Sequence, residues 1–302
     1  MTTAAAPYLI GVDLGGTRIK VLALSEDGTE RERLVVGSDG PDWAARVRSL
    51  VDDLHARLGP SLGIGIAAPG LAAPGGRCIA HMPGRLPGLE GLDWTTHLAS
   101  PRPVPVLNDA QAALLGEVWC GAAVGRRNVL LVTLGTGVGG AVMCDGHLLR
   151  GHLGRAGHVG HITVDASGPP DIVRTPGSLE DAVGNHTLGA RSAGRYHDTA
   201  ALAADVIRGL PLAVDLWTRL ARDLAAGLVS LINVVDPEII LLGGGISQAG
   251  DTLLRPLSLA MDPWEWRPAG RRVQLATTHL GDLAGAYGAA RQAQLHIASP
   301  SS

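Results

Sequence analysis

The feature that most constrains this chain is a pair of apolar runs joined by a turn of almost bare backbone. The run from Val129 to Leu134 breaks into Gly135-Thr136-Gly137-Val138-Gly139-Gly140 and resumes from Ala141 to Cys144. Two apolar runs around a glycine turn predict a β-hairpin. Glycine lets backbone N–H groups approach a phosphate, but a tight hairpin needs glycine for its own conformation as well. This stretch alone leaves both interpretations open.

A second hairpin of the same kind begins the sequence. Tyr8 to Leu14 predicts an apolar strand, Gly15-Gly16-Thr17 a turn and Arg18 to Leu24 a returning strand, with a third strand from Glu32 to Val36. No helix follows these glycines, and the third glycine of the dinucleotide-binding fingerprint is missing. The pattern therefore indicates a β-meander and argues against a dinucleotide-binding fold.

Helices and buried strands follow each hairpin. The first half is expected to continue with helix 42–58, strand 62–67, strand 104–107 and helix 110–120, and the second half with helix 212–234, strand 238–242, strand 273–276 and helix 281–296. Gly243-Gly244-Gly245 forms a third glycine turn at the end of a strand. The repeated succession of elements predicts an α/β fold with internal duplication. Two facing domains with a glycine turn each would form a cleft suited to a polyphosphate.

Polar residues stand at two predicted helix starts. Asn108 and Asp109 lie between a strand and a helix, and an N-cap accounts for one of them but not for both. Ser178 and Asp181 fit a capping box that opens another helix. A loop rich in glycine and proline, from Pro69-Gly70 to about Trp94, is of a length that is usually functional.

Composition excludes several classes of protein. The net charge is −3 and no basic run occurs, so nucleic acid is not an expected partner. The three cysteines have neither metal-ligand nor disulfide spacing. No apolar run approaches the ~20 residues that span a bilayer, and the first residues do not read as a signal peptide. We therefore expect a cytoplasmic protein without a membrane partner. Lys20 is the only lysine, which we interpret as coding bias.

Several motifs, in order, resemble the ROK family (repressors, open reading frames, kinases) of the actin/hexokinase-like ATPase superfamily. They are Val12-Asp13-Leu14-Gly15-Gly16-Thr17, Asn108-Asp109-Ala110, the turn at 134–140, Asn233-Val234-Val235-Asp236-Pro237-Glu238, Leu242-Gly243-Gly244-Gly245 and residues 283–290. The resemblance implies two actin/hexokinase-like (RNase H-like) domains with an interdomain cleft. The expected domains are residues 1–117, completed by the C-terminal helix 286–302, and residues 118–285.

The resemblance also implies ATP-dependent phosphorylation of a sugar hydroxyl, with Asp109 as the general base. Its expected substrate-binding residues are Gly70, Asn108, His158, His161 and Glu180. Its expected nucleotide-binding residues are Gly15, Gly16, Thr17, Thr136, Gly137, Gly244 and Gly245. Asp13 is expected to hold Mg²⁺ through water. Many family members are dimers, so a homodimer is compatible with the resemblance.

The chain departs from the family at its zinc-bearing segment. The family pattern Glu-x-Gly-His reads His158-Val159-Gly160-His161 here, and the family's Cys-x-Cys-Gly-x-x-Gly-Cys reads 171–178 without a cysteine, although Gly177 and the following Glu180 survive. A structural zinc needs about four N or S ligands, so we expect no zinc. His158 in place of a glutamate, with Arg85 in the loop 81–87, would suit a substrate with a carboxylate or other polar substituent.

Other functions compete with a sugar kinase. One is a sugar-binding or regulatory protein without turnover, because the substrate motif has changed while Asp109 is kept. Another is a kinase that uses polyphosphate as donor. A DNA-binding repressor is not expected, because only about nine residues precede the first strand. An actin-like filament protein would have no use for Asn108-Asp109.

Overall fold

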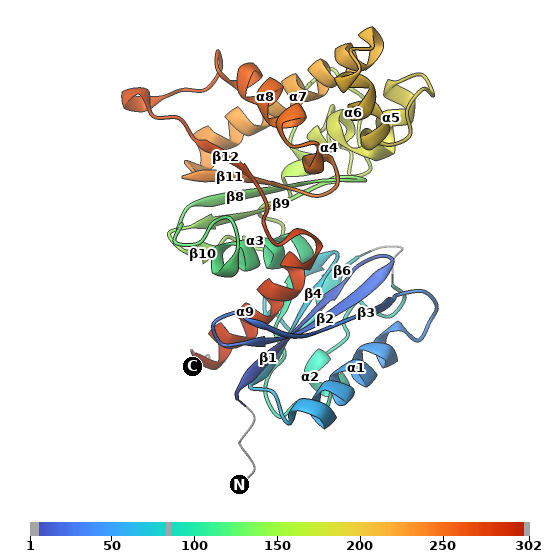
Figure 1. Cartoon of the computed structure of the whole chain (residues 1–302), viewed down its shortest axis with the longest axis vertical. Coiled ribbons are helices and arrows are strands. Elements are labelled where there is room, and N and C mark those ends of the chain that lie inside the picture. The colour runs from blue at the N-terminus through green and yellow to red at the C-terminus, as the bar shows by residue number, and fades with distance from the viewer. Residues whose placement is uncertain (1–5, 83–85, 299–302) are drawn as a thin grey trace. The chain divides into compact units, whose positions relative to one another are not determined.

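The computed structural model describes residues 6–82 and 86–298 and divides into two compact units (Figure 1). Unit 1 consists of the described residues of Met1–Gly125, Arg150–Ala156 and Asp282–Ser302. Unit 2 consists of Arg126–Leu149 and Gly157–Gly281. Arg85, which the sequence singled out for substrate recognition, lies outside the described residues.

Unit 1 contains a five-stranded sheet in the order β3-β2-β1-β4-β7 and a two-stranded sheet of β5 and β6. Its elements are β1 (Tyr8–Leu14), β2 (Arg18–Ser25), β3 (Glu30–Gly37), α1 (Trp43–Leu58), β4 (Gly63–Ala68), β5 (Leu71–Ala72), β6 (Ile79–His81), α2 (Trp94–His97), β7 (Val106–Asn108), α3 (Asp109–Cys120) and α9 (Ala284–Ala298). The expected strands and long helices are confirmed, and the loop after Gly70 also carries β5 and β6.

The central strand β1 is buried along its whole length because helices cover both faces of the sheet. Ile10 and Val12 face the cluster that includes α1, whereas Leu9 faces the cluster that includes α9. Gly11 shares the α9 face, where a Cβ would overlap the Ala286 carbonyl oxygen. Glycine in β1 therefore brings α9 into backbone contact with the sheet, and strand alternation places Asp13 on this same face.

Unit 2 repeats the topology of unit 1. Its five-stranded sheet has the order β10-β9-β8-β11-β12, again a meander of antiparallel strands followed by parallel ones. Its elements are β8 (Val129–Leu134), β9 (Val138–Cys144), β10 (His147–Leu148), η1 (Val159–His161), α4 (Leu179–Val183), α5 (Asn185–Arg191), α6 (Thr199–Ile207), α7 (Pro211–Val235), β11 (Ile239–Gly243), η2 (Ile246–Ala249), α8 (Asp251–Met261), η3 (Pro268–Gly270) and β12 (Gln274–Thr277), with η4 (Gly281–Leu283) at the crossing to unit 1. The predicted duplication is confirmed.

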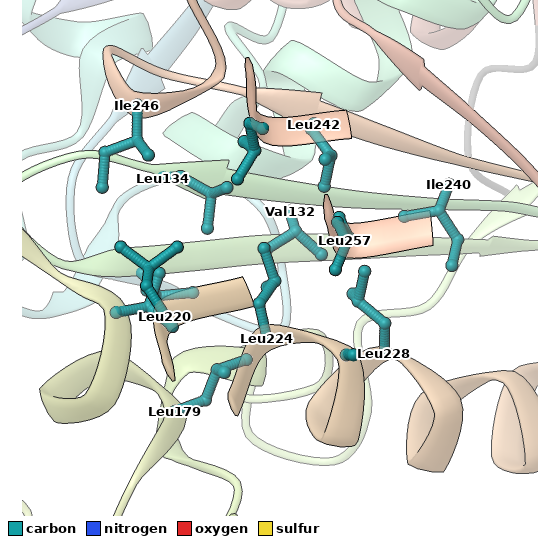
Figure 2. Close-up of a cluster of buried hydrophobic side chains, with 14 of the residues drawn as sticks. Val132, Leu134, Leu179, Leu220, Leu224, Leu228, Ile240, Leu242, Ile246 and Leu257 are labelled. Atoms are coloured by element: carbon teal, nitrogen blue, oxygen red, sulfur yellow. The ribbon is translucent and has the colours of Figure 1, made fainter. Parts of the chain in front are cut away.

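An aliphatic core fixes the sheet of unit 2 to its helices. Figure 2 shows Val132 and Leu134 of β8 and Leu242 of β11 lying toward Leu224 and Leu228 of α7. All five side chains are buried, and the long helix α7 supplies one continuous apolar face. This packing places the ends of β8 and β11, and so the two glycine turns, side by side. In the part of the chain that the structure describes, no helix has the length and apolar character to cross a membrane.

Candidate active site

The start of α3 separates the roles of Asn108 and Asp109. Asn108 is the N-cap: its Oδ1 accepts the N–H groups of Ala110 at 3.0 Å and Gln111 at 3.4 Å. Asp109 is the first residue of the helix and is exposed. The buried Asn108 thus supplies the cap that the sequence required. The Asp109 carboxylate lies at the surface of unit 1, where its Oδ1 also accepts the Ala110 N–H at 2.8 Å.

Gly70 lies beside Asn108. The Asn108 side-chain amide donates to the Gly70 carbonyl at 2.9 Å. Gly70 has a φ of 99°, in the left-handed region, and a Cβ there would lie 2.5 Å from the Cβ of Met82. The turn after β4 therefore needs glycine at this position, and Asn108 fixes it to the start of α3.

Asp13 and Lys20 form a cross-strand pair on β1 and β2. Lys20 Nζ lies 3.2 Å from Asp13 Oδ2, both side chains are 12% exposed, and Lys20 also donates to the Asp282 carbonyl. Burial raises the pKa of Asp13 to about 6, the Lys20 ammonium opposes this, and the Asp109 carboxylate adds to it. The two predicted functional carboxylates of unit 1 are thus close enough to interact.

The first glycine turn leaves its backbone accessible. The Gly15 N–H donates to the Arg18 carbonyl at 2.9 Å, and the Thr17 carbonyl accepts from Ser38 N–H at 3.1 Å. Gly16 and Thr17 are exposed, and a Cβ built on Gly16 meets nothing within 4 Å. Exposed N–H groups in such a turn suit an anion.

The second glycine turn is held by a hydrogen bond to the carboxylate of Glu180. Glu180 Oε2 accepts the Val138 N–H at 2.8 Å, and a Cβ on Gly137 would overlap this oxygen. The Thr136 carbonyl accepts from His186 N–H at 3.0 Å and contacts His186 Nδ1 at 2.9 Å. Burial disfavours the His186 cation, but the bonds to the Thr136 carbonyl and to Asp181 raise its pKa. The turn is therefore held by several hydrogen bonds and adjoins an imidazole whose pKa is raised.

The third glycine turn adjoins the second. Gly244 has a φ of 83°, and a Cβ there would overlap the carbonyl oxygen of Leu134, the residue before the second turn. Gly245 and η2 line a cavity of about 320 Å³ whose other wall is α6, with small side chains such as Ala200 and Ala203. Its apolar walls and neighbouring glycine backbone provide room for a flat ring next to the second glycine turn.

His158 and His161 lie three residues apart at η1 of unit 2. His158 is half-buried and precedes η1 as its N-cap. His161 ends η1, and its Nδ1 lies 2.8 Å from Asp171 Oδ2. Leu179 N–H donates to the carbonyl of Ile162 at 2.9 Å, so that Glu180 and His161 stand on neighbouring segments.

Sequence reasoning missed three residues at these sites, namely Lys20, Asp171 and His186. Lys20 and Asp171 pair with side chains seven and ten residues away, and His186 contacts the Thr136 carbonyl 50 residues away. No local motif encodes these spacings. Among the described residues no group of three or more His, Cys, Asp or Glu side chains is arranged to hold a metal ion. The expected absence of zinc stays a prediction.

Comparison with known proteins identifies the family. The family model described as "ROK family" matches residues 9–295. A glucokinase of Halalkalibacterium halodurans is 33% identical over 93% of each chain. The ROK hexokinase of Thermus thermophilus superimposes with a TM-score of 0.83 at 29% identity, over 97% of this chain and 99% of that one. A ROK glucokinase of Streptomyces griseus, solved with glucose and AMPPNP, gives 0.78 at 27% identity, over 95% and 99%. This chain, with its two duplicated α/β units and paired glycine turns, belongs to the ROK family.

Proposed function

We propose that this chain is an ATP-dependent sugar kinase that transfers the γ-phosphoryl group of ATP to a sugar hydroxyl. The observation that carries the proposal is the division of labour at α3, where Asn108 caps the helix and Asp109 remains exposed. Asp109 accepts the hydroxyl proton while the oxygen bonds to phosphorus and ADP leaves. The similarity to a glucokinase solved with glucose and AMPPNP supports both substrates.

Unit 1 contains the residues that would position the acceptor sugar and hold the metal ion. The second N–H of the Asn108 amide, together with Gly70, positions the acceptor, since the first N–H is bonded to Gly70. Asp13 fits Mg²⁺, because this ion keeps most of its waters and needs few carboxylates beside the phosphates. A Cβ at Gly285 would lie 2.9 Å from Asp13 Cγ, so glycine keeps room for the carboxylate. Mg²⁺ would neutralise phosphate charge when bound, and Gly16 and Thr17 would donate N–H groups to the terminal phosphates. The Gly15 N–H is bonded to the Arg18 carbonyl, so Gly15 would contribute by shaping the turn and not as a donor.

Unit 2 contains the residues that would bind the nucleotide. Thr136 and Gly137 hold phosphate, and Gly244 and Gly245 lie against the adenosine. The cavity beside Gly245 favours ATP over polyphosphate, because its walls are small apolar side chains of α6 and not the row of cations that a polyphosphate needs.

His158, His161 and Glu180 bind the sugar in this proposal. We also propose that the protein is cytoplasmic and forms a homodimer. Its domains would be residues 1–117 with 286–302, and residues 118–285. A substrate with a carboxylate is the special case that His158 would favour, since an imidazole can carry positive charge where a glutamate cannot.

Acceptor-dependent ADP release across hexoses, amino sugars and sugar acids tests the proposed function. We expect at least one acceptor to be phosphorylated with a kcat of roughly 1–100 s⁻¹. The same panel with polyphosphate in place of ATP is expected to give little product. A chain that binds a sugar but releases no ADP with any acceptor would be the regulatory protein instead, and preferential use of polyphosphate would exclude ATP as the main donor.

The pKa of Asp13 predicts the pH dependence of activity. In the proposed mechanism ionised Asp13 would hold Mg²⁺, and the pKa of Asp13 is raised to about 6 mainly by burial. We therefore expect kcat/KM for MgATP to rise about tenfold per pH unit below this value and to level off above about pH 7. Because the folded pKa is raised, Asp13 also makes the protein less stable as the pH rises from about 4 to 6. A kcat/KM that is flat from pH 5 to 8 would remove Asp13 from metal binding.

A further inference from the structure

One buried carboxylate in unit 2 has no role in the chemistry described so far. The Asp171 side chain is 0% exposed, yet it lies in an irregular segment outside the strands of the sheet. Its Oδ1 accepts the N–H groups of Val173 at 2.9 Å and Thr175 at 2.8 Å. A buried charge persists only when such groups satisfy it. The segment is therefore folded around this carboxylate.

The backbone that surrounds Asp171 has an unfavourable conformation at one residue. Arg174 has a φ of 70°, in the region that side chains other than glycine rarely adopt. Its N–H donates to the Asp171 carbonyl at 2.9 Å, and the Asp171 N–H donates to the Thr175 carbonyl at 2.9 Å. Both the backbone and the side chain of Asp171 hydrogen-bond within this turn, so the turn fixes the position of the carboxylate.

The remaining oxygen of Asp171 meets His161. Oδ2 lies 2.8 Å from His161 Nδ1. Burial raises the pKa of Asp171, but the bonds from His161, the Thr175 N–H, Ser178 and the Val173 N–H outweigh it, and the pKa lies below its usual value. An ionised carboxylate only accepts hydrogen bonds. Nδ1 of His161 must therefore carry the proton, and in the neutral ring Nε2 is left as the acceptor.

His161 lies next to the segment that pairs with the start of the helix that carries Glu180, since the Leu179 N–H donates to the Ile162 carbonyl at 2.9 Å. Ser178 is fully buried and is the N-cap of this helix, α4, where it accepts the Asp181 N–H at 3.2 Å. Glu180 lies in the first turn of this helix. Asp171 thus holds one of the three residues assigned to sugar binding in unit 2, and that residue adjoins the segment paired with the start of α4.

We propose that Asp171 is a positioning residue for the acceptor sugar, which fixes the ring orientation and tautomer of His161. This inference rests on the proposed function for its effect on the sugar. Its structural part, the Nδ1–H tautomer of His161, does not depend on what the protein phosphorylates. Carboxylate partners of functional histidines act in this way, by setting which nitrogen is protonated.

The tautomer is measured directly by NMR on the full chain with ¹⁵N-labelled histidine. His161→Asn identifies the His161 signals. We expect a protonated Nδ1 and an unprotonated Nε2 at a pH where the ring is neutral. In Asp171→Asn the two backbone donors retain the amide oxygen, so the NH₂ group faces His161 and the tautomer inverts. An Nε2–H tautomer in the unaltered chain overturns the proposal without any variant, even where Asp171→Asn fails to fold.

Steady-state kinetics separate positioning from general stability. For Asp171→Asn we expect the KM of the sugar to rise about tenfold, with the KM of ATP and kcat within about twofold. Asp165→Asn is the matched control, since Asp165 accepts the Ser167 N–H at 2.9 Å in the same region and is exposed; it should leave both KM values unchanged. In a His161→Asn background, Asp171→Asn should add no more than about twofold, because its effect passes through the imidazole.

The outcomes distinguish this proposal from the proposed function. Absence of turnover by the unaltered chain would contradict the kinase, while the tautomer would still decide the structural claim. An unchanged sugar KM in folded Asp171→Asn, or an equal loss for ATP and sugar, would overturn the positioning role.

Discussion

Asp109→Asn lowers kcat for the preferred sugar by about a thousandfold, while the KM values for sugar and ATP stay within about threefold. The substitution removes the group that accepts the hydroxyl proton but keeps the size of the side chain. It also keeps the helix, because the cap of α3 is Asn108 and not Asp109. The loss is therefore expected in the chemical step and not in folding or binding, and single-turnover kinetics with saturating substrates measure it.

Asp93→Asn provides the control for this experiment. Asp93 also stands at a helix start in unit 1, where it caps α2 by accepting the Thr96 N–H at 3.0 Å. Asparagine is an equally good cap, so we expect normal kcat. If Asp109→Asn retains more than a tenth of the activity, Asp109 is not the general base and phosphoryl transfer depends on alignment and charge neutralisation alone.

Much of the fold was predictable because it follows from local patterns. The apolar runs at β1, β8 and β11 and the glycines between them determine the hairpins, and the repeated order of elements determines the matching sheets. The cap argument at Asn108 was predictable for the same reason, since an N-cap and its helix are adjacent in sequence. The need for glycine at Gly244 is local too, because its φ of 83° lies in a region that other residues rarely adopt.

The contributions of Lys20 and Asp171 were not predictable in this way. Lys20 was interpreted as coding bias, but the register of β1 and β2 pairs it with Asp13. Asp171 stands ten residues from His161 in a segment without periodicity, and its partners are mostly backbone groups. Such partners can be identified only when strand pairing and loop conformation are known. The absence of the cysteines does not indicate that a carboxylate organises this segment instead.

Gly244→Ala and Gly245→Ala should have effects of opposite sign on stability, although the residues are neighbours. Gly244 has a φ of 83°, and an added Cβ would overlap the Leu134 carbonyl oxygen. We expect Gly244→Ala to lower the Tm by about 6–10 °C, from strain and overlap of about 3 kcal/mol. The end of β8 must shift to relieve the overlap, which displaces the Thr136–Gly137 turn. The KM of ATP should therefore rise by about tenfold or more.

Gly245→Ala isolates the nucleotide contact from the fold. Gly245 has a φ of −63° and a ψ of −35°, and an added Cβ meets no atom within 4 Å. Alanine in an allowed, open position stabilises by about 0.4–1 kcal/mol, so the Tm should be equal or slightly higher. Because Gly245 lines the cavity beside α6, a nucleotide in that cavity meets the new methyl group, and the KM of ATP should rise several-fold while the KM of the sugar is unchanged. Unchanged ATP kinetics in Gly245→Ala would place the adenosine elsewhere on unit 2, whereas equal losses of Tm in both variants would mean that the turn does not have this geometry.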